Sequence, residues 1–468
     1  MSPVLESSDI GVIGLGVMGL NLALNIADRG FNVVAYEKNS NLFDVAVETA
    51  PSLFCCDDLQ TFIQNIKRPR SILIMITAGP AIDEILAHLK PFLLKNDIII
   101  DAGNSNYKDS LRRESLLYKN DIKYIGLGVS GGAKGARYGP AIMAGGDYPS
   151  YAKIEPILRS IAAKTKGNDI CAVHLGTSSG VGHFVKMMHN GIEYADMQII
   201  CECYSLLTIG MGLDAKKSSK VFESWSKSEL SSYLIEITSL ILKYIDQDSK
   251  KPLIDLIADN AEQKGTGKLA SIAALELGVS APSIFEAVSA RIISSLKSER
   301  IEASAIFEKP NIVSTKLNLN ILKNALFAAK ICSYAQGFAV LRAADDHYNW
   351  NMKFFQIANV WRAGCIIRAN FLDDVADAFV QNPSLSNLII APHFSSILKE
   401  TIPSLRTVVK WSVSRGIPSP VFSASLAYFD SYTSISLPAN LIQAQRDYFG
   451  SHGYERLDKQ GTFHTDWE

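Results

Sequence analysis

The sequence of 468 residues predicts an α/β domain over residues 1–180, an all-α domain over 181–437 and a short C-terminal tail over 438–468. Three observations predict this order. In the first part, short apolar runs typical of strands alternate with helical segments, which favours a parallel sheet covered on both faces. From about Val181 the pattern changes to long helical periodicity. From about Pro438 the polarity is mixed, which indicates a tail that is frayed or docked on a partner.

The composition is that of a globular enzyme and excludes several other classes. Apolar residues make up 47% of the chain, charged residues 20%, and the formal net charge is −1. This balance offers no electrostatic footprint for nucleic acid or an anionic membrane. No apolar run approaches the ~18 residues of a membrane span, and the N-terminus lacks a signal-peptide pattern. The seven cysteines fit neither a zinc site nor a CxxC motif. We therefore expect reduced thiols, a cytoplasmic location and no metal centre.

The first predicted strand, Asp9–Ile13, enters the glycine-rich sequence GLGVMG. Gly14 permits a tight turn, Gly16 lets a pyrophosphate approach the backbone, and Gly19 allows close contact between helix and strand. The helical pattern LNLALNIADRG follows, and its N-terminus offers free N–H groups to phosphates. With FNVVAYE as the second strand, the pattern predicts a Rossmann-type dinucleotide site. The alternative is a glycine-rich turn without a ligand.

Three further strands are predicted at Ser71–Thr77, Asp97–Ser105 and Ile122–Gly132. Ligands of parallel sheets bind at the carboxyl ends of the strands. Asn104 and the turn Ser130–Gly132 lie at two such ends, and the glycines of that turn expose N–H groups that suit a carboxylate or a phosphate. The alternatives are an Asx turn at Asn104 and a simple cap at the serine.

The most informative segment is GHFVKMMHNGIEY, over Gly182–Tyr194. Lys186, His189, Asn190 and Glu193 lie at offsets of 0, 3, 4 and 7 residues, which place them on one stripe of a helix with about 3.6 residues per turn. A base, an acid and two polar groups on an otherwise apolar helix are costly to bury unless they face water or a substrate. The stripe is therefore a candidate catalytic face. The alternative is a solvated stripe with a salt bridge.

Two features of the helical domain indicate an anion site. The segment AEQKGTGK combines the cation Lys264 and the hydroxyl of Thr266 with glycines, which are the groups that hold a phosphate. It is not a Walker A motif, because the spacing differs and no strand precedes it; a flexible basic loop is the alternative. Arg291 lies in the apolar stretch IFEAVSARIISSL, where an arginine usually needs an anionic partner.

Taken together, the motifs resemble the 6-phosphogluconate dehydrogenase family along essentially the whole chain. The matching segments are GLGVMGLNLALNIADRGF, DAGNSNY, GVSGGAKGARYGPAIM, GHFVKMMHNGIEYADMQ, QKGTGK, WRAGCIIR and LIQAQRDYFGSHGYE. The wider β-hydroxyacid dehydrogenase group shares the nucleotide pattern, the glycine-rich turn and a helix lysine. QKGTGK and QAQRDYFG are specific to the phosphogluconate branch.

The resemblance implies oxidative decarboxylation of 6-phosphogluconate to ribulose 5-phosphate and CO2 with NADP, a step of the pentose phosphate pathway. It implies that Lys186 is the base and Glu193 the acid, in a homodimer whose tails donate Arg446 and His452 to the other subunit's site. The implied substrate residues are Asn104, Ser130, Gly131, Gly132, His189, Asn190, Tyr194, Lys264, Thr266, Arg291, Arg446 and His452. The implied cofactor residues are Gly14, Leu15, Gly16, Val17, Met18, Gly19, Glu37, Lys38, Asn39, Thr77, Ala78 and Asn104.

A lysine that acts as a base must be neutral, so the pKa of Lys186 has to fall toward ~7–8. Burial and neighbouring cations can both lower it, and Lys264 and Arg291 are the candidate cations. Glu193 is expected to act as the acid, because the reaction ends with the protonation of a carbon atom of the substrate.

The sequence departs from the family pattern where the second strand ends. Glu37, Lys38 and Asn39 stand in place of the family's Asn-Arg-Thr. An acidic residue there ordinarily hydrogen-bonds a ribose 2′-OH and repels a 2′-phosphate, whereas Lys38 can pair with the phosphate less specifically than an arginine. We expect NADP from the family and leave NAD, or use of both, open. Three further departures are Gly16 for alanine, Thr77 for lysine and Ala133 for glutamate.

Two other activities compete with this expectation. A β-hydroxyacid dehydrogenase acting on an unphosphorylated acid would not need Lys264, Thr266, Arg291 and Arg446. A catalytically silent nucleotide-binding protein would lack a working acid–base pair, yet the sequence retains Lys186 together with a carboxylate on the same helix stripe.

Overall fold

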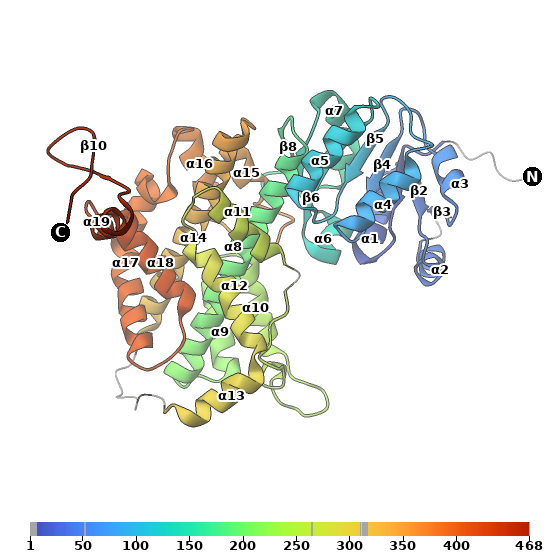
Figure 1. Cartoon of the computed structure of the whole chain (residues 1–468). Helices are drawn as coiled ribbons and strands as arrows, with labels where there is room; N and C mark the ends of the chain where they lie inside the picture. The colour runs from blue at the N-terminus through green and yellow to red at the C-terminus, as the bar shows by residue number, and fades with distance from the viewer. Residues whose placement is uncertain (1–6, 51–52, 264, 309, 311–316, 468) are drawn as a thin grey trace, which may run out of the picture.

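The structure is a computed structural model that describes residues 7–50, 53–263, 265–308, 310 and 317–467. A sheet domain, a bundle of helices and a terminal tail follow one another through the molecule, with the sheet domain at one end and the tail at the other (Figure 1). The predicted fold class, an α/β domain followed by an all-α domain, is confirmed.

The sheet has eight strands in the order β3-β2-β1-β4-β5-β6-β7-β8. Every neighbouring pair is parallel except β6 and β7, which are antiparallel. The sequence pattern does not reveal β3, β7 or β8. The strand bounds are β1 Ile10–Ile13, β2 Val33–Tyr36, β3 Phe54–Cys56, β4 Ser71–Ile74, β5 Ile98–Asp101, β6 Lys123–Ser130, β7 Ala141–Gly145 and β8 Ala172–Gly176.

The sheet is parallel, as the sequence predicts, except that β7 runs antiparallel to β6. Only the short helix α6 (Gly132–Tyr138) separates β6 from β7, and a crossover to a parallel strand needs a dozen or more residues. The chain therefore turns back on itself. The predicted strand that runs to Thr77 is also too long, because β4 ends at Ile74 and the chain then leaves the sheet toward the positive-φ residue Gly79.

Helices cover both faces of the sheet, as its alternating side chains require. Val12 and Ile100 pack with the apolar sides of α1 and α7, whereas Ile13 and Ile99 pack on the opposite face with α3 and α4. The helix bounds are α1 Val17–Asp28, α2 Ser40–Thr49, α3 Leu59–Gln64, α4 Pro80–Leu89, α5 Tyr107–Tyr118, α6 Gly132–Tyr138 and α7 Tyr148–Ile161.

Two long helices, α8 and α14, form the centre of the helical domain and pack against each other. α8 runs from Gly180 to Ser205 and continues as a π-helical segment over Leu206–Gly210. Its first turns touch the sheet, and its remaining turns lie within the bundle (Figure 1). The other bounds are α9 Ala215–Trp225, α10 Tyr233–Lys243, α11 Thr266–Glu276, α12 Pro282–Ser295, α13 Lys297–Ile306, α14 Leu319–Tyr348, α15 Phe354–Val360, α16 Leu372–Gln381, α17 Pro392–Val413 and α18 Pro420–Tyr432, with 3-10 turns at Leu253–Asp255 and Leu388–Ile390.

The tail is an ordered unit that projects from the helical bundle (Figure 1). It consists of α19 (Ala439–Gly450) and a small hairpin of β9 (Tyr454–Glu455) and β10 (Thr462–Phe463). The buried carboxylate of Asp447 holds them together, since it accepts hydrogen bonds from the Gly453 and Thr465 amides and from the side chains of His464 and Trp467.

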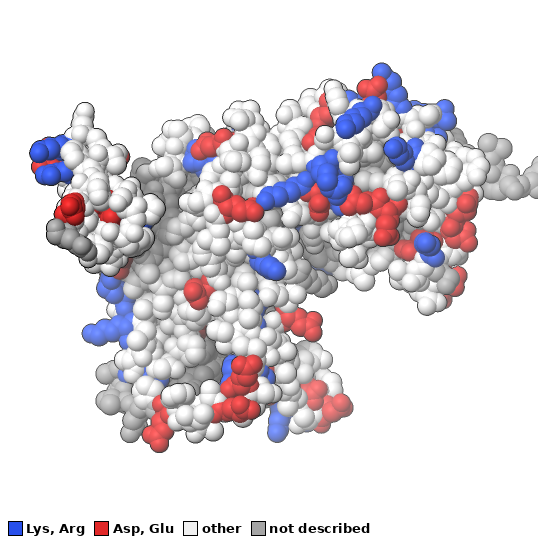
Figure 2. Space-filling model, viewed as in Figure 1, with Lys and Arg blue, Asp and Glu red and all other residues white. Residues whose placement is uncertain are grey.

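Charge is distributed without a dominant sign. Figure 2 shows basic and acidic side chains interspersed over the sheet domain, with fewer of either over the middle of the bundle. Among the residues that the structure describes, no helix combines the length and the apolar character that crossing a bilayer demands.

Candidate active site

Glycines bring the start of α8 unusually close to the sheet. A Cβ atom at Gly126 would lie 2.1 Å from the carbonyl oxygen of Ser179, and one at Gly182 would lie 2.3 Å from the carbonyl oxygen of Gly126. A Cβ atom at Gly128 would lie 2.5 Å from the Cβ of Lys186. Only glycines therefore allow the stem of this lysine to lie against β6, and the strand leads its amine toward the turn where β6 ends.

Lys186 lies within a compact polar cluster although only 7% of its surface is exposed. Its Nζ donates to Oδ1 of Asn190 at 2.6 Å and to Oγ of Ser130 at 3.3 Å, and Nδ1 of His189 lies 3.2 Å away. Burial lowers the pKa of the lysine, while the Glu193 carboxylate opposes this effect. Desolvation is the cause that lowers this pKa, and no cation among the described residues adds to it; the expected cation Lys264 lies outside them.

His189 connects the base with the acid. Its Nδ1 lies 3.6 Å from Oε2 of Glu193, and its Nε2 lies 3.2 Å from Oγ of Ser130. Burial, and then the charge of Lys186, hold the pKa of this imidazole well below its ordinary value, so the ring is neutral. A neutral imidazole separates the two groups without adding charge to the site, with Nδ1 as the ring atom that faces both of them.

Glu193 is the most open member of the stripe, with 21% of its side chain exposed. Burial raises the pKa of its carboxyl, and Asp196 acts in the same direction, whereas Lys186 and Arg291 oppose the rise. A carboxyl group with a raised pKa is suited to act as a proton donor near neutral pH.

Arg291 marks the other end of the site. Its guanidinium carbon lies 3.5 Å from the centroid of the Tyr194 ring, and none of the ion pairs found among the described residues involves it. Gly267, beside Thr266 at the start of α11, packs on the same ring, because a Cβ there would lie 2.5 Å from it. The structure thus brings Tyr194, Thr266 and Arg291 together, and Lys264 lies outside the described residues.

Asn104 is exposed in the loop after β5, at the sheet edge that also carries Ser130. The loop is fixed by the buried Asp101, which accepts hydrogen bonds from the Gly103 amide at 3.1 Å, Ser105 Oγ at 2.7 Å and the Tyr124 hydroxyl at 2.7 Å. Sequence reasoning did not assign a role to this aspartate. The feature of the sequence that could have pointed to this role is a carboxylate at the end of the apolar run DIIID.

The turn of Gly131 and Gly132 is sealed from behind by the segment WRAGCIIR of the helical domain. Gly131 has φ +121°, and a Cβ there would lie 2.5 Å from the carbonyl oxygen of Gly364. That oxygen also accepts a hydrogen bond from the Ala141 amide at 3.0 Å. The backbone amides of the turn are therefore held by a segment more than two hundred residues away, whose function the sequence did not indicate.

The glycine-rich loop has the shape of a phosphate cradle. Gly14 has φ +93°, and a Cβ at Gly19 would lie 1.9 Å from the carbonyl oxygen of Gly14. A Cβ at Gly16 would meet nothing within 4 Å, and the adjacent Val17 is exposed. The N-terminus of α1 therefore opens toward free space, with Leu15 and Met18 on either side of this pair.

Glu37 has a structural task that its spacing did not predict. Its Oε2 accepts a 2.7 Å hydrogen bond from the Leu15 amide, and its Oε1 accepts one of 2.9 Å from the Asn39 amide. The carboxylate thus ties the glycine-rich loop to the end of β2. Lys38 beside it is exposed, and Thr77 and Ala78 lie in the β4–α4 loop.

The tail residues do not enter the site of their own chain. Arg446 is exposed on α19, where its Nη1 contacts Oε1 of Gln443 at 3.1 Å, and His452 is exposed just after that helix. Figure 1 shows the tail at the end of the molecule opposite the sheet domain.

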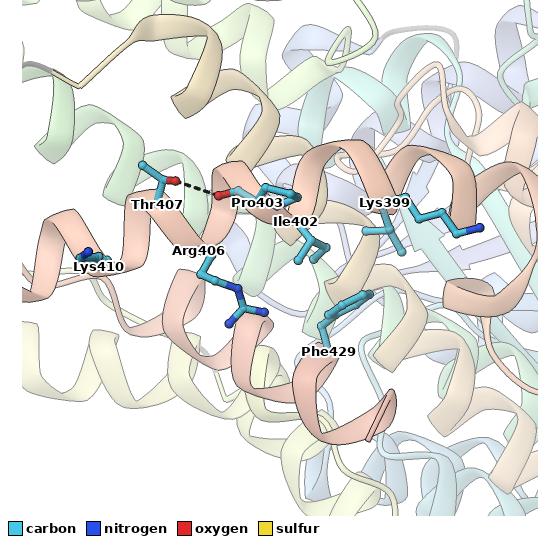
Figure 3. Close-up of a pocket in the computed structure, with 8 residues that line it drawn as sticks. Lys399, Ile402, Pro403, Arg406, Thr407, Lys410 and Phe429 are labelled. Atoms are coloured by element: carbon cyan, nitrogen blue, oxygen red, sulfur yellow. Dashed lines mark hydrogen bonds between the residues drawn. The ribbon is translucent and has the colours of Figure 1, made fainter. Parts of the chain in front are cut away.

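A separate hollow of about 490 Å³ lies between α17 and α18 (Figure 3). Its walls combine apolar side chains with cations, and Arg406 at its edge pairs with Asp430. None of the predicted site residues lines it. The lining residues are Leu398, Lys399, Ile402, Pro403, Arg406, Thr407, Lys410 and Phe429.

Comparisons with known proteins agree over the whole chain. Family models describing the NAD binding domain and the C-terminal domain of 6-phosphogluconate dehydrogenase match residues 9–176 and 182–467. The sequence is 47% identical over 469 residues to the NADP(+)-dependent, decarboxylating 6-phosphogluconate dehydrogenase of Bacillus subtilis, with 99% of this chain and 100% of that protein covered. It is 48% identical over 466 residues to the decarboxylating enzyme of Staphylococcus epidermidis, with 98% and 99% covered.

One solved structure resembles this chain over almost its full length. Plasmodium falciparum 6-phosphogluconate dehydrogenase is 43% identical and superposes with a TM-score of 0.95, with 98% of this chain and 100% of that chain covered. That protein has been solved in its apo form, with its cofactor NADP+ and with its substrate 6-phosphogluconate.

Proposed function

The chain belongs to the 6-phosphogluconate dehydrogenase family, and on that premise we propose that it converts 6-phosphogluconate to ribulose 5-phosphate and CO2 with NADP as the oxidant. The observation that carries the proposal is the buried Lys186, whose amine lies with the carboxyl of Glu193 on either side of Nδ1 of His189. A base and an acid with oppositely shifted pKa values suit a reaction that begins with proton removal and ends with proton delivery.

The nucleotide edge of the sheet fits NADP. The open cradle at Gly16 and the free N-terminus of α1 suit a pyrophosphate, and Lys38 is the cation we assign to the 2′-phosphate. When bound, the cofactor supplies a hydride acceptor for C3 of the substrate. Thr77, Ala78 and Asn104 lie on the loops of the same edge and complete the proposed pocket.

Lys186 acts first, as the general base. Desolvation lowers the pKa of its amine and so favours the neutral form, in which Nζ accepts the proton of the C3 hydroxyl while that carbon becomes a ketone. The hydrogen bond to Oδ1 of Asn190 holds one N–H of the amine and orients its lone pair. Once Lys186 is protonated, burial strengthens the electrostatic interaction of its ammonium group with negative charge on the substrate.

Decarboxylation follows, because the new C3 carbonyl lies β to the carboxylate. The C1–C2 bond breaks, CO2 leaves, and its electron pair moves toward the carbonyl oxygen, which takes a proton from the Lys186 ammonium. The protonated Glu193 then delivers its proton to the carbon that lost CO2, which is C1 of the product, while the enol hydroxyl returns its proton to Lys186 and becomes the ketone at C2. The side chain is open enough to reach it, with 21% exposed.

The two ends of the substrate need different partners. Ser130, Asn104, His189, Asn190 and the amides of the Gly131–Gly132 turn are proposed to hold the sugar acid, since they gather around Lys186 at the strand ends. Arg291 is proposed to bind the 6-phosphate, because it has no carboxylate partner among the ion pairs of the described chain. Tyr194 and Thr266 adjoin it, and Lys264 is retained from the sequence alone.

We also propose a homodimer in which Arg446 and His452 enter the site of the other subunit. The tail projects from the bundle and carries exposed apolar side chains, including Tyr448 and Phe449, which is typical of a surface that packs on a partner. We propose a cytoplasmic location as well, which the seven free thiols support. The division into domains near residues 180 and 437 is likewise a proposal.

Mixing two inactive variants tests the exchange of tails. A heterodimer of Lys186→Met and Arg446→Ala subunits keeps one intact site only if Arg446 acts on the partner subunit. Co-expression of both chains should then restore about a quarter of wild-type turnover, since about half of the dimers are mixed and each has one working site. No recovery in purified mixed dimers would contradict the exchange.

The overall activity is tested by following reduced nicotinamide with 6-phosphogluconate and each nucleotide separately, and by collecting CO2. We expect turnover with CO2 release and a preference for NADP. A second candidate activity, on an unphosphorylated β-hydroxy acid, predicts that Arg291→Ala leaves the KM for 6-phosphogluconate unchanged. Our proposal predicts a rise of tenfold or more, in line with the ~1.5–3 kcal/mol of a charge-assisted hydrogen bond.

A further inference from the structure

The polar stripe of α8 does not end at Glu193. Three residues further along the same face lies Asp196, which is 1% exposed. Residues three apart on a helix are neighbours on its surface. The acid of the site therefore has a second carboxylate beside it, buried inside the helical bundle.

Asp196 is held by a cation from the other central helix. Nζ of Lys330 on α14 lies 2.5 Å from Oδ1 and 2.6 Å from Oδ2 of Asp196, and the lysine side chain is 0% exposed. An ion pair so completely removed from water persists only when both partners are charged and well oriented, because each alone is costly to bury. The pair thus holds the Asp196 carboxylate in one place, one turn from Glu193.

The next turn of α14 supports the opposite wall of the site. The hydroxyl of Tyr334 donates a 2.9 Å hydrogen bond to the carbonyl oxygen of Ile367, in the segment that carries Gly364 and Cys365. One face of α14 therefore holds both the helix of the acid and the segment behind the glycine turn. The ring of Tyr334 is itself buried and lies in the field of Asp196 and Glu193.

We propose that the Asp196–Lys330 ion pair is a positioning element that keeps Glu193 in its protonated, proton-donating state. Asp196, the negative end of the pair, lies one turn beyond Glu193 on α8, so ionisation of that carboxyl would place two anions on adjacent turns of the helix. Lys330 holds the carboxylate of Asp196 in one orientation through hydrogen bonds to both of its oxygens. This inference deepens the proposed function and assigns a role to two residues that do not touch the substrate.

Other groups face Glu193 and set the balance in which the pair acts. Lys186 and Arg291 favour the ionised carboxylate, whereas burial and Asp196 favour the neutral acid. His189, at 3.6 Å, is neutral and contributes a dipole rather than a charge. Without Asp196, Lys186 and Arg291 would keep the Glu193 carboxyl ionised down to a lower pH.

The test removes both charges together, because Asp196→Asn alone would leave Lys330 buried without a partner. The double variant Asp196→Asn, Lys330→Met keeps the volume of the pair. Glu193 is titrated directly by the infrared band of its protonated carboxyl, assigned as the band that Glu193→Gln removes. We expect its midpoint to fall by roughly 0.5–1 pH unit in the double variant. This readout does not depend on turnover.

Kinetics provide the second readout. The basic limb of kcat, where the acid loses its proton, should move to lower pH by the same amount, while the KM for 6-phosphogluconate changes less than about twofold. The matched control is the buried pair Arg70–Asp97 of the sheet domain, 2.9 Å apart. Its double variant Arg70→Met, Asp97→Asn should leave the band and the limb in place.

The outcomes distinguish the positioning role of the ion pair from the proposed function of the enzyme. An unchanged Glu193 midpoint in a folded double variant overturns the positioning role. If the double variant does not fold, the midpoint is measured in Lys330→Arg, which keeps the charge and should reproduce the wild-type value; a shifted midpoint there contradicts the proposal. If the double variant shows the band shift but the wild-type protein does not turn over 6-phosphogluconate, the proposed function is refuted and the positioning role stands.

Discussion

Nζ of Lys186 donates a hydrogen bond of 2.6 Å to Oδ1 of Asn190, one helical turn further along α8. The acceptor is an amide oxygen, which carries no net charge, so it orients the amine and favours the protonated form much less than a carboxylate would. This choice of partner matters because burial alone lowers the pKa of the lysine, and a carboxylate in the same place would reverse the effect.

Asn190→Asp tests this relationship. An anion at hydrogen-bond distance favours the ammonium, so the pKa of Lys186 should rise by about 1–3 units. A general base works only when neutral, and the acidic limb of kcat/KM should therefore move to higher pH by that amount. The measurement is a pH profile of kcat/KM, with Asn190→Ala as the control that removes the bond without adding charge. A limb that stays in place in the aspartate variant would mean that Lys186 is not the titrating base.

Lys186→Met tests the base itself. Methionine fills a similar volume but cannot accept a proton, so kcat should fall by at least the ~10²–10⁴-fold of a lost general base. Binding of the nucleotide, measured by fluorescence, should change little, because the nucleotide loop lies on β1 and α1. Substantial residual turnover in this variant would remove the lysine from the mechanism.

Gly128→Ala is expected to disable the site through packing. The new methyl group would lie 2.5 Å from the Cβ of Lys186 and 2.6 Å from the carbonyl oxygen of Gly182, so α8 must shift away from β6. We expect a destabilisation of about 1–3 kcal/mol and a drop in kcat of tenfold or more. The control is Gly135→Ala in α6, whose added Cβ would meet its nearest neighbour at 3.5 Å, an ordinary contact. Equal activities of the two variants would show that the approach of α8 to β6 is not critical.

Glu37→Gln separates the two tasks of Glu37. The amide oxygen can still accept the bond from the Leu15 amide, but the negative charge that opposes a 2′-phosphate is gone. The ratio of kcat/KM for NADP to that for NAD should rise. Glu37→Ala, which also loses the anchor of 2.7 Å, should raise the KM for both nucleotides. A ratio unaffected by either change would show that Glu37 takes no part in the choice of nucleotide.

We expect the stability of the protein to depend on pH through Glu202, a residue outside the active site. This buried carboxylate on α8 accepts hydrogen bonds from the amides of Val421 and Phe422 at the start of α18. Burial nevertheless raises its pKa from 4.5 to about 7. Between these two values the folded state holds a proton that the unfolded state releases, so its contribution is complete below pH 4.5 and is lost as the pH rises through about 7.

The corresponding change in the free energy of unfolding is about 3 kcal/mol, at ~1.4 kcal/mol per unit of pKa shift. Denaturant titrations of the wild type and of Glu202→Gln, at several pH values across this range, provide the measurement. The glutamine variant cannot titrate and should show a flatter dependence. Parallel curves for the two proteins would contradict the assignment of the raised pKa to Glu202.

Much of this architecture follows from local pattern. The glycine-rich loop, the strands β1, β2, β4, β5 and β6, and the stripe on α8 are periodic or bounded by glycine, and such signals depend only on neighbours in the chain. The direction of β7 does not follow in this way, because it depends on how short α6 is. The pairing of Asp196 with Lys330 is equally invisible, since 134 residues separate them.

By itself the sequence determined which side chains lie on one face of α8, because helical spacing is a property of the backbone. It could not determine that desolvation, rather than a neighbouring cation, lowers the pKa of Lys186. Burial is created by strands and helices that come from distant parts of the chain. Only the tertiary structure decided that Gly128 makes room for the lysine, that Glu37 secures the nucleotide loop and that Asp196 stands beside the acid, because each depends on a contact across the fold.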